Sequence, residues 1–86
     1  VGLIVVDSRD NVAVVTDFTR AGEGLRGVKG QEIHCLSDIP QYHKVAIRNI
    51  AEGEPVVKYG EHIGIATTAI RIGEHVHDHN LRPEED

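Results

Sequence analysis

Ile50-Ala-Glu-Gly-Glu-Pro-Val56 and Ile70-Arg-Ile-Gly-Glu-His-Val76 share one pattern in the second half of the chain. A third, imperfect copy, Ile39-Pro-Gln-Tyr-His-Lys-Val45, has Tyr42 at the glycine position and His43 where the other copies have Glu54 and Glu74. Each copy indicates an apolar anchor, a tight turn and the start of a strand, because glycine adopts the positive φ that such turns require. The units are too short and too unevenly spaced for a solenoid. They predict a small, convoluted all-β domain whose chain turns back often.

Short β-branched runs between turn residues mark the remaining strands. The expected strands are Leu3–Val6, Val12–Val15, Ile33–Leu36, Val45–Ile50, Val56–Tyr59, Ile63–Thr68 and His75–His79. A turn is expected at Asp7–Asn11, and Thr19–Gly30, with four glycines, is expected to form a loop or a loosely paired hairpin. No window sustains a helical stripe. Only Ser37–Tyr42 indicates a single helical turn, with Ser37 or Asp38 as its cap and Pro40 near its first position.

The chain has 86 residues, which predicts one domain over residues 1–86 with a flexible acidic tail at about 82–86. It has no Trp or Met, one Phe and two Tyr, so its core lacks the large aromatic side chains that stabilise many small domains. One cysteine excludes a disulfide within the chain. A domain of this size is often completed by assembly, so a homo-oligomer or a larger partner is expected.

Charge and hydropathy exclude several classes of partner. The net charge of −5 and the scattered basic residues argue against nucleic-acid or acidic-membrane binding. No segment approaches the roughly 20 apolar residues of a membrane span, and no signal peptide is recognisable. The cytoplasm is the expected compartment, in agreement with the unpaired Cys35, which is expected to be a small buried hydrophobe.

Three of the six histidines, His75, His77 and His79, stand at alternate positions near the C-terminus. In an extended segment their imidazoles would project to one side, with Val76 and Asp78 on the other. Neutral imidazole is a ligand for Zn, Fe, Ni or Cu, so this face could hold a metal or a bound acid. The alternative is an edge strand whose histidines are simply solvated.

Five motifs in a fixed order make the chain resemble the SAF domain of the altronate dehydratase (UxaA) family. They are Asp10-Asn11-Val12-Ala13-Val14, His43-Lys44-Val45-Ala46, Lys58-Tyr59-Gly60, Ile63-Gly64 and Gly73-Glu74-His75-Val76-His77-Asp78-His79-Asn80. The resemblance extends from about Val5 to Leu81. The family usually has glycine before the His-Lys pair, whereas this chain has Tyr42. The resemblance implies a β-clip fold, in which short twisted strands fold over on themselves.

Enzymes of this family eliminate a group β to a carboxylate, so the resemblance implies a lyase component. Sugar-acid dehydratases remove water from altronate or galactarate, and a related lyase releases sulfite from 3-sulfolactate. Most of such an enzyme is a large UxaA-type catalytic subunit or domain, either separate or fused. The charged end Leu81–Asp86 favours a separate small subunit, although an N-terminal domain cut from a longer chain would look the same. Either form is expected to be inactive without its partner and to act on a small acidic substrate.

The resemblance also implies roles for individual residues. Removing a proton α to a carboxylate requires a base and a concentrated positive charge. The family implies a divalent metal, Fe²⁺ or alternatively Mn²⁺, held mostly by the partner and not required for folding. The expected catalytic residues are His43 and Lys44, the expected substrate contacts Asn11, Lys58, Tyr59 and Asn80, and the expected metal ligands His75, His77 and His79.

Each of these assignments has a structural alternative. Lys58 and Tyr59 could only cover the flank of the domain, and Gly60 and Gly64 are expected to meet backbone requirements. His34 and His62 lie outside the motifs and are expected at the surface or in packing contacts. For the whole chain, a sugar-acid dehydratase component is the main reading. A sulfolactate sulfo-lyase subunit and a non-catalytic carbohydrate-binding module are the alternatives.

Overall fold

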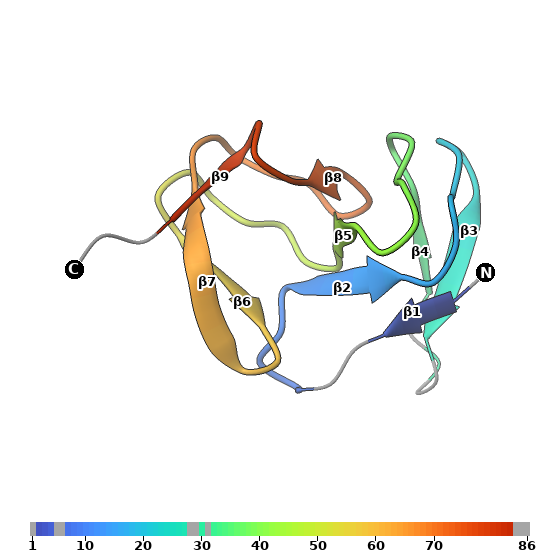
Figure 1. Cartoon of the computed structure of the whole chain (residues 1–86), viewed down its shortest axis with the longest axis horizontal. Helices are drawn as coiled ribbons and strands as arrows, with labels where there is room; N and C mark the ends of the chain where they lie inside the picture. The colour runs from blue at the N-terminus through green and yellow to red at the C-terminus, as the bar shows by residue number, and fades with distance from the viewer. Residues whose placement is uncertain (1, 5–6, 28–29, 31, 84–86) are drawn as a thin grey trace.

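The computed structural model describes residues 2–4, 7–27, 30 and 32–83, which form nine short strands and no helix (Figure 1). The strands are β1 (Gly2–Ile4), β2 (Val12–Val15), β3 (Gly24–Gly27), β4 (Glu32–His34), β5 (Lys44–Ala46), β6 (Pro55–Lys58), β7 (Glu61–Ala66), β8 (His75–Val76) and β9 (Leu81–Arg82). The predicted all-β class is therefore confirmed. The described part of the chain contains no helix, and therefore no helix that is long and apolar enough to cross a membrane.

Two sheets build the domain, which measures 36 × 23 × 19 Å. The larger sheet has the order β4-β3-β1-β2-β5-β8, and the smaller one has the order β6-β7-β9. Only the β1–β3 pair is parallel among the described strand pairs. In Figure 1 the smaller sheet lies at the left, and β2, β5 and β8 lie between it and the β3–β4 hairpin.

Strands β2 and β5 separate two apolar clusters and contribute to both, because successive side chains of a strand point to opposite faces. The first cluster contains Leu3, Ala13, Val15, Leu25, Ile33, Cys35, Ile39 and Val45. The second contains Val12, Ala46, Ile50, Val56, Ala66, Ile70 and Val76 and joins the larger sheet to the smaller one. All four residues of β2 are buried, which explains its continuous apolar run.

Four turns of one design connect the strands. Each contains a residue of positive φ, namely Gly22 (92°), Tyr42 (66°), Gly53 (85°) or Gly73 (95°). In each, the next residue donates its amide to the carbonyl three residues earlier: Glu23 to Arg20, His43 to Pro40, Glu54 to Ala51 and Glu74 to Arg71. The positive-φ residue of each turn also donates its amide to a carbonyl at or next to the end of another strand: Gly22 to Cys35, Tyr42 to Val15, Gly53 to Ala66 and Gly73 to Ala46. The internal repeat seen in the sequence is thus a repeated backbone path.

The fourth copy, around Thr19 and Gly22, was not anticipated from the sequence. Its anchor is a threonine rather than an apolar residue, yet Thr19 is fully buried and its hydroxyl donates to the carbonyl of Asp17 at 3.1 Å. Thr19 pairs with Ile39 in the same way as Ile50 pairs with Ile70. The pair Gly22-Glu23, which matches Gly53-Glu54 and Gly73-Glu74, was the sequence feature that could have revealed this copy.

Two predicted segments differ in the structure. The prediction of a helical turn at Ser37–Tyr42 is wrong, because Ile39 forms an antiparallel β-bridge with Thr19 and Tyr42 adopts a positive φ, which a right-handed helix excludes. The strand predicted over His75–His79 ends at Val76, since the chain turns at 78–80.

Most other expectations agree with the structure. The turn within Asp7–Asn11 and a strand in each of the remaining predicted runs are present, although the boundaries shift by a few residues. Thr19–Gly30 contains β3, which pairs with β4 as a hairpin. Strand β9 was not expected, and Arg82, assigned to the acidic tail, belongs to it. Val5 and Val6 of the first predicted strand, and residues 84–86 of the tail, lie outside the described residues.

Gly60 and Gly64 meet the backbone requirements that were predicted for them. Tyr59 (φ 56°) and Gly60 (φ 76°) form the tight β6–β7 turn, and a Cβ on Gly60 would lie 2.7 Å from a carboxylate oxygen of Asp7. A Cβ on Gly64 would collide with the carbonyl oxygen of Arg82. Strand β9 can therefore approach β7 only because residue 64 has no side chain.

Candidate functional site

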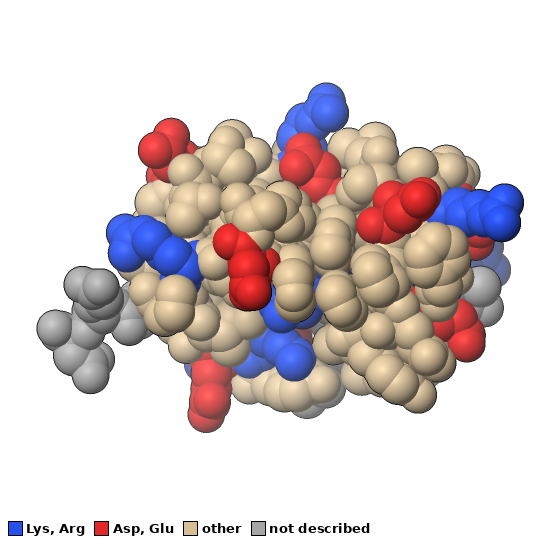
Figure 2. Space-filling view, turned by 45° about the horizontal axis from the view of Figure 1, so that its top comes forward, with Lys and Arg blue, Asp and Glu red and all other residues tan. Residues whose placement is uncertain are grey.

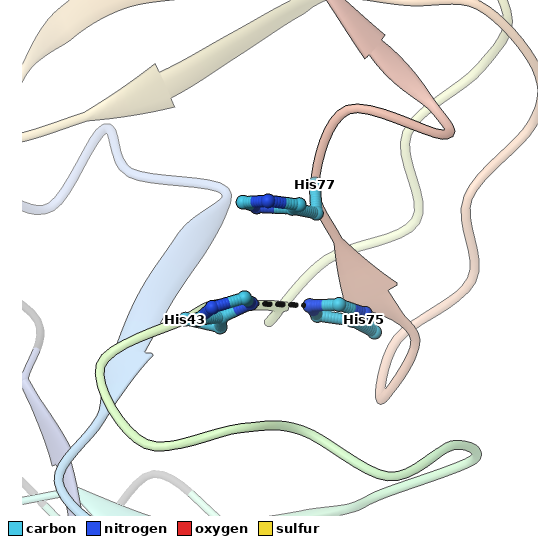
Figure 3. A group of neighbouring side chains, drawn as sticks. All are labelled: His43, His75 and His77. Atoms are coloured by element: carbon cyan, nitrogen blue, oxygen red, sulfur yellow. Dashed lines mark hydrogen bonds between the residues drawn. The ribbon is translucent and has the colours of Figure 1, made fainter.

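The imidazole of His43 meets those of His75 and His77, although it lies 32 residues before His75 in the sequence, beside the β5–β8 pair (Figure 3). His43 precedes β5, His75 belongs to β8 and His77 follows it. Val45 pairs with His75, so His75 and the alternate residue His43 project to the same face of the sheet. We call His43, His75 and His77 the imidazole cluster.

The rings of the cluster are in direct contact. Nδ1 of His43 and Nε2 of His75 are hydrogen-bonded at 2.9 Å. The ring of His77 stacks on that of His43, with centroids 4.4 Å apart, and lies 5.6 Å from the ring of His75. His79 is more exposed, but its ring centroid is still 5.3 Å from that of His75. The predicted gathering of the C-terminal histidines is therefore present, although a turn rather than a strand produces it.

The surroundings keep His75 uncharged at neutral pH. Partial burial lowers the pKa of His75 to about 4, and the neighbouring His43, His79, His77 and Lys44 add to the decrease. A neutral imidazole has a free lone pair, which is the form that accepts a proton or binds a metal. The cluster therefore contains at least one nitrogen that is available at pH 7.

Asn80 and Ser37 hold the histidine segment in place. Asn80 is buried, its side-chain amide donates to the carbonyl of His75 at 2.9 Å, and its oxygen accepts the amide of His77 at 3.0 Å. The hydroxyl of Ser37 accepts the amide of His75 at 2.9 Å. Ser37 was expected only as a helix cap, and no feature of the sequence indicated this contact. Asn80, expected to touch the substrate, uses its side chain here to shape the backbone.

Asn11, another expected substrate contact, joins the two sheets. Its side chain donates to the carbonyl of Pro55 at 2.9 Å and accepts the amide of Val57 at 2.7 Å. The neighbouring Asp10 is buried, and its carboxylate accepts the amide of Gly60 at 2.7 Å. This part of the Asp10–Val14 motif thus fixes β2 against the β6–β7 hairpin, and substrate contact by Asn11 stays a prediction.

Lys44 follows His43 but projects to the other face of β5, with its partners Val14 and Val76. Burial lowers the pKa of Lys44, the charge of Lys58 lowers it further, and Asp78 opposes the decrease. The ammonium of Lys58 lies 4.8 Å from the centre of the Tyr59 ring, a cation–π contact. In Figure 2 charged side chains of both signs are interspersed with uncharged ones, so this view shows no extended surface of one charge.

The imidazole cluster fits the donor set of a transition-metal ion. One ring nitrogen from each of His43, His75 and His77 lies within 4.8 Å of the others. Nitrogens bound to one tetrahedral ion at about 2.1 Å lie roughly 3.4 Å apart, so these three nitrogens would have to move closer together to bind one ion. Three protein ligands leave room for further ligands from a substrate or a second body.

Comparison with known proteins agrees with this architecture. The family described as the altronate/galactarate dehydratase SAF domain matches residues 1–84. The chain is 39% identical to altronate dehydratase of Bacillus subtilis (strain 168), over 92% of this chain and 16% of that protein. It is 41% identical to the (2R)-sulfolactate sulfo-lyase subunit alpha of Chromohalobacter salexigens, over 95% of this chain and 94% of the relative.

The relatives differ in how much of their length the chain spans. It covers about a sixth of altronate dehydratase and also 13% of galactarate dehydratase (L-threo-forming) of Escherichia coli (strain K12), to which it is 39% identical. It covers nearly all of the sulfo-lyase subunit alpha. These relatives are dehydratases or lyases by name, and the family match over residues 1–84 includes the residues of the imidazole cluster. The chain belongs to the family of altronate/galactarate dehydratase SAF domains.

Proposed function

We propose that the chain is the SAF component of a metal-dependent sugar-acid dehydratase that eliminates water β to a carboxylate. A larger catalytic subunit or domain is required for turnover. The convergence of His43, His75 and His77 supports this proposal, because three imidazoles that could serve as acid, base or metal ligand lie together on a scaffold similar to parts of known lyases. Altronate and galactarate are the substrates to test first, since relatives at 39% identity are named for them.

The hydrogen bond between His43 and His75 suits proton transfer. When Nδ1 of His43 carries the shared proton and donates it to Nε2 of neutral His75, Nε2 of His43 is free to accept a proton. That nitrogen takes the proton α to the substrate carboxylate and returns it to the hydroxyl that leaves as water. Loss of water yields an enol, which becomes a 2-keto acid.

In the other tautomer the shared proton lies on Nε2 of His75, and Nε2 of His43 carries a proton, so His43 is not the base in that state but His75 could bind a metal. Nδ1 of His75 is then free as a ligand beside His77, and further ligands would come from the partner. A bound Fe²⁺ or Mn²⁺ ion would supply positive charge to the substrate carboxylate and the neighbouring hydroxyl. Lys44 and Lys58 repel each other, and Lys44, although on the opposite face of β5, is close enough to lower the pKa of His75; their charges would attract the acidic substrate.

A second candidate is the small subunit of a sulfolactate sulfo-lyase, in which sulfite rather than water leaves. The 41% identity to a sulfo-lyase subunit is no lower than the 39% identity to altronate dehydratase, so similarity does not favour one leaving group. The imidazole cluster serves both reactions, because both begin with loss of the proton α to a carboxylate.

The test is reconstitution with the larger lyase chain of the same genome, loaded with Fe²⁺ or Mn²⁺ without oxygen. Altronate, galactarate and sulfolactate are supplied separately, and 2-keto acid and sulfite are measured. Release of 2-keto acid from altronate or galactarate supports the main proposal, and release of sulfite supports the second candidate. Absence of product from all three substrates, in a complex shown to be assembled and metal-loaded, contradicts both.

A further inference from the structure

Tyr42 occupies a backbone conformation that the three equivalent turns reserve for glycine. Its φ is 66°, and the corresponding residues are Gly22, Gly53 and Gly73. The left-handed region is unfavourable for a side chain such as that of tyrosine. The Tyr42 ring is 68% exposed, the highest value among the exposed large hydrophobic residues that the structure describes. Among the described residues, no hydrogen bond or ring contact is made with the Tyr42 side chain, whereas the Tyr42 amide donates to the carbonyl of Val15 at 2.9 Å and so helps to hold the turn.

Two further exposed apolar side chains belong to segments that contact the imidazole cluster. Leu36 is 48% exposed and Ile72 is 40% exposed. The Leu36 amide donates to the carbonyl of Gly73, which places the two segments side by side. The residue after Leu36, Ser37, is hydrogen-bonded to His75. Tyr42 directly precedes His43. We call Leu36, Tyr42 and Ile72 the apolar rim.

Exposed apolar side chains next to polar, reactive groups are typical of binding surfaces. The cluster beside this rim is only half-buried, whereas proton abstraction α to a carboxylate benefits from the exclusion of water. A strained backbone conformation that the surrounding structure maintains is also commonly found at functional positions. Together these observations indicate that another body covers the rim and the imidazoles.

We propose that the apolar rim docks onto the larger lyase subunit or domain and that Tyr42 is its central contact. The identity of the occupant rests on the proposed function. It follows from length and position, because the matched region is 16% of altronate dehydratase, so the remainder of that relative is the body available to cover the half-open cluster. A second copy of this chain is the competing occupant.

The experiment measures the affinity of the full chain for the larger lyase chain of the same genome, by interferometry, together with the melting temperature of the free chain. Tyr42→Gly is expected to raise the melting temperature by about 4 °C, because glycine relieves the strained backbone. The same change is expected to weaken the complex at least tenfold, since exposed tyrosines at interface centres contribute strongly to affinity. Opposite signs for stability and binding distinguish a docking residue from a merely structural one.

Matched variants locate the surface. Leu36→Ser and Ile72→Ser are each expected to weaken the complex about fivefold or more. Ile4→Ser is the control, because Ile4 is 42% exposed but pairs with Val14 and so faces away from His43 and His75. It should leave affinity within twofold of the original. Wild-type affinity in all three rim variants, equal weakening by Ile4→Ser, or a homodimer that the rim variants dissociate would each overturn the proposal.

Docking and catalysis can fail separately. A tight complex that loses affinity in the rim variants, yet converts none of the three acids when metal-loaded, would leave the docking surface in place and refute the proposed activity. Turnover that persists in rim variants with unchanged affinity would refute the docking surface and support the proposed activity.

Discussion

The turn at Gly53–Glu54 and the turn at Tyr42–His43 have the same backbone path but different tasks. In the first, the carboxylate of Glu54 accepts the amide of Ala51 at 2.8 Å, so the glutamate stabilises its own turn. In the second, the position equivalent to Ala51 is Pro40, which has no amide hydrogen to bind. The carboxylate is therefore dispensable there, and His43 turns toward His75 instead. In a repeated turn, a position that is not needed for the stability of one copy can therefore carry a side chain with a chemical role.

The largest expected effect separates glycines that need only a positive φ from one that also needs space. A Cβ on Gly73 would collide with the carbonyl oxygen of His34, whereas a Cβ on Gly53 would meet nothing within 4 Å. Gly73→Ala should therefore cost about 3 kcal/mol or more, or abolish folding. Gly53→Ala should cost only about 1–2 kcal/mol. Urea unfolding monitored by circular dichroism measures both, and equal losses would show that backbone strain alone governs these turns.

The second effect concerns the chemical side of the comparison. His43→Gln in the assembled enzyme should reduce kcat about a hundredfold, as expected for loss of a general acid–base group, with little change in the stability of the free chain. His34→Gln is the matched control, because His34 is exposed on β4 and lies outside the cluster. If His43→Gln lowers only the amount of assembled complex, the histidine is as structural as Glu54.

A third effect is a pH dependence that His75 confers on the fold. The pKa of His75 is lowered to about 4 in the folded chain, whereas an unfolded histidine titrates near 6.5. Between these values the unfolded chain binds more protons, so stability falls as the pH is lowered from about 6.5 to 4. His75→Gln should flatten this part of the profile of melting temperature against pH. An exposed charge change such as Arg20→Gln should not, and an unchanged slope in His75→Gln would contradict the assignment.

The smallest effect tests whether the glutamate of a turn matters only where an amide faces it. Glu54→Ala should cost about 1 kcal/mol, since it leaves the Ala51 amide without its side-chain partner. Glu54→Gln, which keeps an acceptor oxygen, should cost less. His43→Gln, which keeps a side chain able to form a hydrogen bond with His75, should show no comparable loss in the free chain, because Pro40 offers the turn no donor. Chemical denaturation of the four proteins side by side decides between these outcomes.

The sequence was informative where one residue type has one physical use. Paired Gly-Glu signals located two of the turns, and β-branched runs located most strands. It failed where the tertiary structure decides. Ser37–Tyr42 has the residues of a helix start, but pairing of Ile39 with Thr19 extends it, and β9 forms only because Gly64 admits a close neighbour.

The candidate site was partly predictable for similar reasons. Alternation grouped His75, His77 and His79 from the sequence, whereas the approach of His43 depends on pairing of β5 with β8, which no local pattern reveals. Resemblance to the family supplied His43, and spacing could not. Because His43 and Lys44 are adjacent, alternation also places their side chains on opposite faces of the sheet. The His-Lys motif was nevertheless predicted to act as one catalytic pair.

One asparagine determines how independently this corner of the molecule can move. Strand β8 has only two residues, and the loop beyond it is closed by the two side-chain hydrogen bonds of Asn80. His77 therefore sits on a clasp, the loop beyond β8, that can open while Val76 stays packed in the second apolar cluster. Amide hydrogen exchange at His77 is accordingly expected to be faster than at Val45, and a ligand that bridges the cluster will close the clasp as it binds.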